Sequence, residues 1–144
     1  MTNGICRALV PAILGLVFCG CAAKAVNTTE WGDLKADQRV LIETQRTEFK
    51  EAVVSRVVED LEKDLCYVKV IDLKRLENEP ATDYDAVVVV NTCKAWRLTG
   101  GASKFVKTFP YMDKVVLLTT AGGEDWKPKS VEVDAITSAS KEQK

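Results

Sequence analysis

The sequence of 144 residues contains no histidine, which is the commonest general base and the commonest metal ligand in proteins. It also lacks a Cys-x-x-Cys pair, and its five cysteines show no repeated zinc-like spacing. Without histidine, no side chain stands out as a nucleophile activated by a neighbouring base. The sequence therefore predicts no catalytic or metal-binding constellation.

Extremes of charge are missing as well. The net charge is −1, and 47% of the residues are hydrophobic. A chain of this length and composition can bury one ordinary core, and it is neither basic enough to indicate a nucleic-acid-binding face nor polar enough to indicate disorder. We expect one folded domain and no nucleic-acid partner.

An apolar stretch near the N-terminus runs from Ala8 to Ala23. It is shorter than the ~20 residues that span a bilayer and has the length of a secretory signal. Its end resembles a bacterial lipoprotein signal, in which residues 1–20 are removed after Gly20 and Cys21 becomes the lipidated N-terminus. The alternatives are an ordinary signal peptide cut near Ala22 or Ala23, and an uncleaved anchor.

The lipoprotein signal implies where the protein resides. Acyl chains on Cys21 would hold the chain at a membrane of the cell envelope, since each buried CH₂ contributes ~0.8 kcal/mol. The alanine that follows this cysteine indicates the outer membrane, facing the periplasm, if the source is a diderm bacterium. Residues 21–37 show little periodicity and are interpreted as a tether.

The stretch Tyr84–Asn91 contains four consecutive valines. A strand with one wet face alternates apolar and polar residues, whereas a strand buried on both faces is continuously apolar. β-Branched residues also favour strands. We therefore expect a central strand of a parallel sheet that is covered by helices on both sides.

The neighbouring segments complete a β-α-β pattern. Thr47 is a suitable N-cap for an amphipathic helix, and the polar Lys69 and Asp72 indicate that the second strand lies at a sheet edge. The apolar stripe of that helix is expected at Phe49, Val53, Val57 and Leu61, with Val54, Val58 and Leu65 beside it. Alternating strands and helices predict a parallel sheet. Strands are expected at Arg39–Thr44, Tyr67–Leu73 and Lys114–Thr119, helices at Glu48–Leu65 and Ala102–Phe109, and at most a short helix within Lys74–Asp83.

The segments "KVIDL", "YDAVVVVN" and "KVVLLTTAGG" make residues 38–126 similar to a flavodoxin-like domain. The resemblance implies an α/β three-layer sandwich with a parallel sheet in strand order 2-1-3-4. The fifth strand is expected to be missing or vestigial, with residues 127–144 forming a tail. The fourth strand would then be an open edge, where we expect a homodimer or a protein partner to pair.

Flavodoxins bind FMN at the loops that follow the first, third and fourth strands, and ligands of open parallel sheets bind at that edge. Here the first loop lacks the glycine of a phosphate site, and Glu48 and Glu51 add negative charge. The two loop tryptophans either sandwich a flavin or cap the edges of the core. The cofactor-binding residues implied by the resemblance are Thr44, Thr47, Thr92, Trp96, Gly122 and Trp126.

The tail provides an alternative covalent flavin site. Val133–Ser140 resembles the attachment motif of secreted FMN-binding domains, in which a hydroxyl at the position of Ser140 carries FMN, although Ser138 replaces the expected glycine. The simpler interpretation is a short strand at Val131–Ile136. Cys66 and Cys93 are expected at opposite ends of their strands, too far apart for a disulfide.

Two functions remain open. The first is an exported, lipid-anchored accessory or binding module without catalysis. The second is a redox protein that carries FMN.

Overall fold

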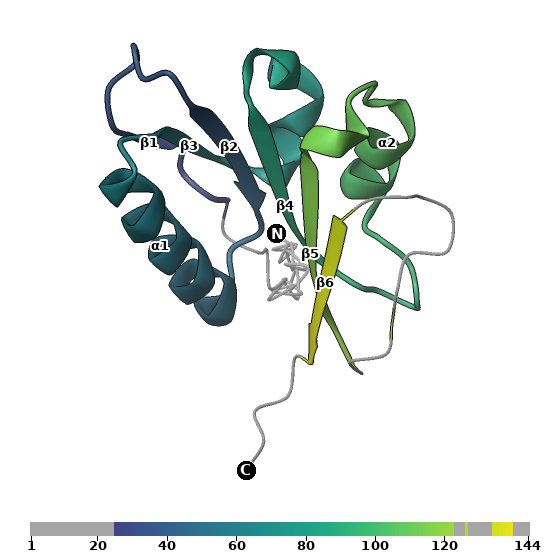
Figure 1. Ribbon diagram of the computed structural model, residues 1–144. Coiled ribbons are helices and arrows are strands. Elements are labelled where there is room, and N and C mark those ends of the chain that lie inside the picture. The colour runs from purple at the N-terminus through teal and green to yellow at the C-terminus, as the bar shows by residue number, and fades with distance from the viewer. Residues whose placement is uncertain (1–24, 123–125, 127–133, 140–144) are drawn as a thin grey trace, which may run out of the picture.

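The computed structural model describes residues 25–122, 126 and 134–139, and residues 1–24, which include Cys21, lie outside it. Its strands form one sheet in the order β1-β3-β2-β4-β5-β6 (Figure 1). The strands are β1 (Thr29–Trp31), β2 (Arg39–Thr44), β3 (Tyr67–Asp72), β4 (Ala86–Thr92), β5 (Val115–Ala121) and β6 (Asp134–Ala139). The helices are α1 (Glu48–Lys63) and α2 (Gly100–Thr108), with the short 3-10 helices η1 (Leu73–Asn78), η2 (Ala81–Asp83) and η3 (Met112–Lys114).

The valine-rich strand β4 lies at the centre of the sheet, as predicted. It pairs in parallel with β2 on one side and with β5 on the other. Val87, Val89 and Val90 are fully buried. The continuous apolar run is explained by this double burial, because both faces of the strand need apolar side chains.

The strand order differs from the predicted one, because two further strands extend the sheet. β1 pairs antiparallel with β3, so the sheet is mixed and β3 is not an edge. β6 pairs in parallel with β5, so a fifth parallel strand is present. Both strands lie in ranges that were predicted to be a tether and a tail. The edge of β5 that was expected to bind a partner is therefore occupied by β6.

Helix α1 begins at Glu48, as predicted, because the Thr47 side chain caps it by accepting the Lys50 backbone N–H at 3.3 Å. Its buried residues are Lys50, Val54 and Val58. This buried stripe is rotated from the predicted row of Phe49, Val53, Val57 and Leu61 toward Val54 and Val58, which were expected beside that row. The helix also ends earlier than predicted, because Leu65 has a positive φ of 59° and is 82% exposed.

The two faces of the sheet carry separate hydrophobic cores. Helix α1 packs Val54 and Val58 against Ile42 and Val70 on one face. Helix α2 and η1 pack against Leu41 and the core valines of β4 on the other face, so the elements form three layers (Figure 1). Among the described residues, no helix has both the length and the apolar character needed to cross a bilayer.

Candidate ligand site at the carboxyl edge of the sheet

The parallel strands end in polar residues that are nevertheless buried. Thr44, Asp72, Asn91 and Thr120 lie at or near the carboxyl ends of four neighbouring strands. Because these strands are parallel, their ends meet at one edge of the sheet, where open α/β sheets bind ligands. This edge is therefore the first place to examine for a site.

Lys50 is the most unusual residue at this edge. It is 1% exposed, and its Nζ donates to Gln45 Oε1 at 3.2 Å and to Thr92 Oγ1. Burial, with a smaller contribution from the positive charge of Lys94, lowers the pKa of Lys50 to about 8. Within the described part of the chain its amine makes no ion pair, so its charge is balanced by neutral oxygens alone.

Sequence reasoning missed Lys50. The lysine follows Phe49, the first residue of the predicted apolar stripe, and a lysine beside such a stripe is ordinarily solvated. In the structure Phe49 is exposed and Lys50 takes the buried position. The only signal available was the spacing: Lys50, Val54 and Val58 follow one another every four residues, so they lie on one face of the helix.

The predicted residues of the first loop are largely engaged within the protein. The Thr44 hydroxyl donates to the Gln45 carbonyl at 3.3 Å, and Thr47 caps α1. Thr92, by contrast, contacts both Lys50 and Gln45, the latter through a hydrogen bond of 3.1 Å to Oε1. Of the three predicted threonines, Thr92 is the one placed beside the buried amine.

The predicted tryptophan loops do come together. The Trp126 indole N–H donates to the Trp96 carbonyl at 3.1 Å, which joins the loops after β4 and β5. Trp96 is 78% exposed and does not cap the core. Gly122, which follows β5 directly, is also exposed. Ser140 lies outside the described residues.

The turn that carries Trp96 has an unusual backbone. Ala95 and Trp96 have φ values of 49° and 64°, and the left-handed conformation costs a non-glycine residue about 1–2 kcal/mol. Two backbone hydrogen bonds between Lys94 and Arg97, of 2.9 and 3.0 Å, close the turn. The tryptophan is thus held outward by a strained, closed turn.

A second polar group lies on the α2 face of the same edge. Asn91 and Thr119 are register partners, and both are buried. The Asn91 Oδ1 accepts from the Thr99 backbone N–H at 3.3 Å and from the Thr99 hydroxyl, whereas Asn91 Nδ2 and Thr119 Oγ1 have no partner. These two atoms leave hydrogen-bonding capacity at the start of α2.

Glu43 is a buried carboxyl on the α2 face of β2. It is 0% exposed, and neither carboxyl oxygen has a hydrogen-bond partner. Burial, reinforced by the charge of Glu79, raises the pKa of Glu43 to about 9, so the group is protonated at neutral pH. No metal-binding group of three or more His, Cys, Asp or Glu side chains occurs among the described residues.

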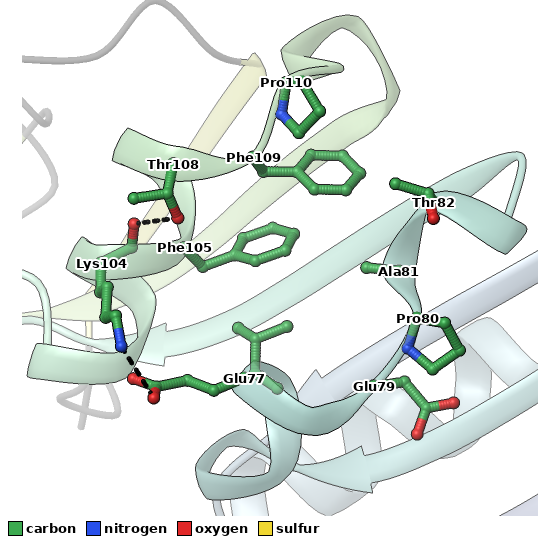
Figure 2. Close-up of a pocket in the computed structure, with 11 residues that line it drawn as sticks. Glu77, Glu79, Pro80, Ala81, Thr82, Lys104, Phe105, Thr108, Phe109 and Pro110 are labelled. Carbon is green, nitrogen blue, oxygen red and sulfur yellow. Dashed lines mark hydrogen bonds and ion pairs between the residues drawn. The ribbon is translucent and has the colours of Figure 1, made fainter.

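A cavity of about 360 Å³ lies elsewhere, between α2 and the segment η1–η2. Figure 2 shows Phe105 and Phe109 facing Ala81 and Thr82 across it. Its charged side chains are paired: Lys104 with Glu77 at 2.9 Å at the rim, and Glu79 with Lys69 at 2.6 Å. Because the described residues leave no unbalanced charge in this cavity, whereas they give Lys50 no anionic partner, the carboxyl edge is the stronger candidate for a functional site.

The two cysteines of the folded part are not bridged. Cys66 precedes β3 and Cys93 follows β4, at opposite edges of the sheet, and both are free. This agrees with the prediction from strand geometry. The Cys93 backbone N–H donates to the Thr120 carbonyl at 2.8 Å, which extends the β4–β5 pairing.

Comparison with known proteins gives no relative. No family model matches the chain, and no match is found among the curated proteins or the solved structures.

Proposed function

We propose that this protein is a binding module without catalysis, held at a membrane of the cell envelope by lipid on Cys21, and that it binds a small anionic ligand around Lys50. The observation that carries the ligand proposal is the buried Lys50 ammonium, whose partners are the neutral oxygens of Gln45 and Thr92. A buried cation is ordinarily paired with an anion, because desolvation of an unpaired charge is costly. A bound anion would supply the missing partner.

The position of Lys50 supports this proposal. In doubly wound sheets, ligands bind where the strand order reverses. Here β2 lies between β3, which is the next strand in the sequence, and β4. The strand order therefore reverses at β2. Lys50 and Gln45 follow β2, and Thr92 ends β4, so the three side chains lie at the reversal.

The charges around α1 are compatible with an anion. Glu48 and Glu51 at the start of the helix were expected to repel a phosphate. Both are exposed, and Glu51 pairs with Arg46 at 2.7 Å, so solvent and Arg46 screen them. Lys94 adds positive charge near Lys50.

Binding of inorganic phosphate to the purified full chain tests the proposal, with isothermal titration calorimetry at neutral pH as the measurement. Loss of a charge-assisted hydrogen bond should weaken binding about 10- to 100-fold in Lys50→Met. Lys107→Met is the matched control, because Lys107 is exposed in the last turn of α2 and should leave affinity unchanged. Thr92→Val, which keeps the amine, should weaken binding less.

Two outcomes would overturn this proposal. One is equal affinity of the wild type and Lys50→Met for phosphate, when thermal unfolding shows that both proteins are folded. The other is the absence of any binding heat with the wild type for both phosphate and FMN.

FMN-dependent redox function is the second candidate. Counted from β2, the parallel strands run 2-1-3-4-5, which is the flavodoxin-like order, and this supports that kinship. The hydrogen bond that joins Trp126 to Trp96 brings both tryptophan loops to the edge that carries Lys50. If a flavin bound at this edge, Lys50 would be the candidate partner for its phosphate.

An absorption spectrum of the purified chain, followed by titration of its tryptophan fluorescence with FMN, tests this candidate. Yellow protein or quenched emission supports it, and colourless protein without quenching excludes it. If the colour survives denaturation in the wild type and is lost in Ser140→Ala, the flavin is attached covalently through the tail.

A further inference from the structure

The chain enters the fold at the carboxyl edge of the sheet. The Val26 backbone N–H donates to Asp72 Oδ2 at 2.8 Å, and the Thr28 hydroxyl accepts from Arg75 at 2.6 Å. Val26 is the fifth residue after Cys21, and a chain of that length reaches at most ~18 Å. The tether expected over residues 21–37 is therefore much shorter, and a lipid on Cys21 would lie close to this edge.

Exposed charges divide between the two edges of the sheet. Lys74, Lys94 and Arg97 are exposed in the segments that follow the carboxyl ends of β3 and β4. At the opposite edge, acidic residues outnumber basic ones among the exposed residues that the structure describes. Lys35 and Lys63 are exposed there, and the exposed aspartates are Asp33, Asp37, Asp64, Asp83, Asp85 and Asp113.

This division favours one orientation at an anionic surface. Lipid headgroups of negative charge attract basic side chains within about a Debye length and repel the acidic edge. Among the described residues, Glu48 and Glu51 are exposed acids near the carboxyl edge, and Arg46 neutralises one of them. Charge complementarity and the short tether thus point the same edge toward the membrane.

Trp96 provides an interfacial side chain at this edge. It is exposed between Lys94 and Arg97, in the closed turn whose left-handed residues hold it outward. Tryptophan beside lysine or arginine is typical of the membrane–water interface, where an amphipathic ring meets the headgroups. Phe49, in the first turn of α1, is also exposed at this edge.

We propose that the carboxyl edge of the sheet lies against an anionic lipid surface, with Trp96 in the headgroup region and Lys94 and Arg97 on the headgroups. The inference rests on the proposed lipidation of Cys21, which sets the distance to the membrane. It adds that the edge of the sheet that carries the proposed ligand site around Lys50 faces the bilayer.

The test uses the full chain, produced in a bacterium with its own N-terminus and reconstituted in phosphatidylglycerol vesicles that contain brominated lipid. Tryptophan emission should be quenched strongly in the wild type and much less in Trp96→Asn, because asparagine tolerates the left-handed backbone and keeps the turn. Leu34→Asn is the matched control, since Leu34 is an exposed apolar residue at the acidic edge. It should be quenched like the wild type.

Two further measurements distinguish contact of the carboxyl edge with the membrane from attachment through a lipid on Cys21. Replacing both basic residues in Lys94→Gln/Arg97→Gln, or using phosphatidylcholine vesicles, should reduce the quenching. Incorporation of an alkyne-labelled fatty acid, lost in Cys21→Ser, reports the anchor independently.

The outcomes are distinguishable. If Cys21 is labelled but the wild type and Trp96→Asn are quenched equally, the proposed orientation is overturned and the lipidation of Cys21 stands. Trp96-dependent quenching without labelling supports the orientation and overturns lipidation. Absence of both overturns the two proposals together.

Discussion

At the scale of single residues, two buried ionisable groups lie on opposite faces of the sheet. Glu43 shares the α2 face with Val89, and Lys50 contacts Thr92 on the α1 face. Burial shifts both pKa values toward the neutral form, upward for Glu43 and downward for Lys50. Their effects on stability therefore have opposite dependence on pH.

Replacing Glu43 with Gln should flatten the stability profile below pH 8. The pKa of Glu43 is raised from 4.5 to about 9, so its contribution to stability is full below pH 4.5 and is lost as the pH rises toward 9. The slope in that window is about 1.4 kcal/mol per pH unit, or roughly 4 kcal/mol between pH 5 and pH 8. Urea unfolding of both proteins at these two pH values measures the difference.

Lys50 does not confound this comparison. Its pKa is lowered from 10.5 to about 8, so its effect is a gain of stability as the pH rises through that higher window. Parallel stability profiles for the wild type and Glu43→Gln would show that Glu43 is not buried as described.

At the scale of elements, β1 depends on one glycine. Gly32 follows β1 with a φ of 78°, and an added Cβ would lie 2.3 Å from the Cys66 carbonyl oxygen. Both the positive φ and the contact exclude a side chain here. The turn lets the chain pass from β1 to the start of β2 across the start of β3.

Gly32→Ala should destabilise the protein by about 2 kcal/mol or more, because the backbone must move away from Cys66. Thermal or urea unfolding measures the loss. Gly100→Ala is the control: Gly100 has no atom within 4 Å of an added Cβ and begins α2, so alanine should be neutral or slightly stabilising there. Equal stability of the two variants would contradict the turn as described.

Elements with apolar content could be predicted from the sequence, and the others could not. β2, β4 and the start of α1 were correct because valine runs and the Thr47 cap are strong local signals. β1 was missed, because a strand of three residues leaves no hydrophobic pattern. A short strand was expected at Val131–Ile136, and β6 begins three residues later, at Asp134–Ala139. What was missed is its parallel pairing with β5, which extends the sheet.

The location of the site could be predicted from the sequence, but its central residue could not. Parallel strand ends converge at one edge whatever their side chains, so the loops and Thr92 could be placed there. The burial of Lys50 depends on which face of α1 packs against the sheet, and tertiary packing decides that face. The pairing of Arg46 with Glu51 likewise could not be predicted from residue types.

At the scale of the whole molecule, one edge of the sheet concentrates every feature that suggests function. The buried amine of Lys50, the closed turn of Trp96 and the entry of the chain at Val26 all lie at the carboxyl ends of the strands. The acidic edge carries none of them. Ligand binding and membrane attachment would therefore share one surface.

The most direct test of this account is the titration of the Lys50 Nζ by NMR in the full chain, with and without inorganic phosphate. The account predicts a pKa of about 8 without phosphate, because the amine is buried beside neutral oxygens. It also predicts a rise of that pKa on adding phosphate, because a bound anion stabilises the charged form. A pKa near 10.5 that phosphate does not move would contradict it.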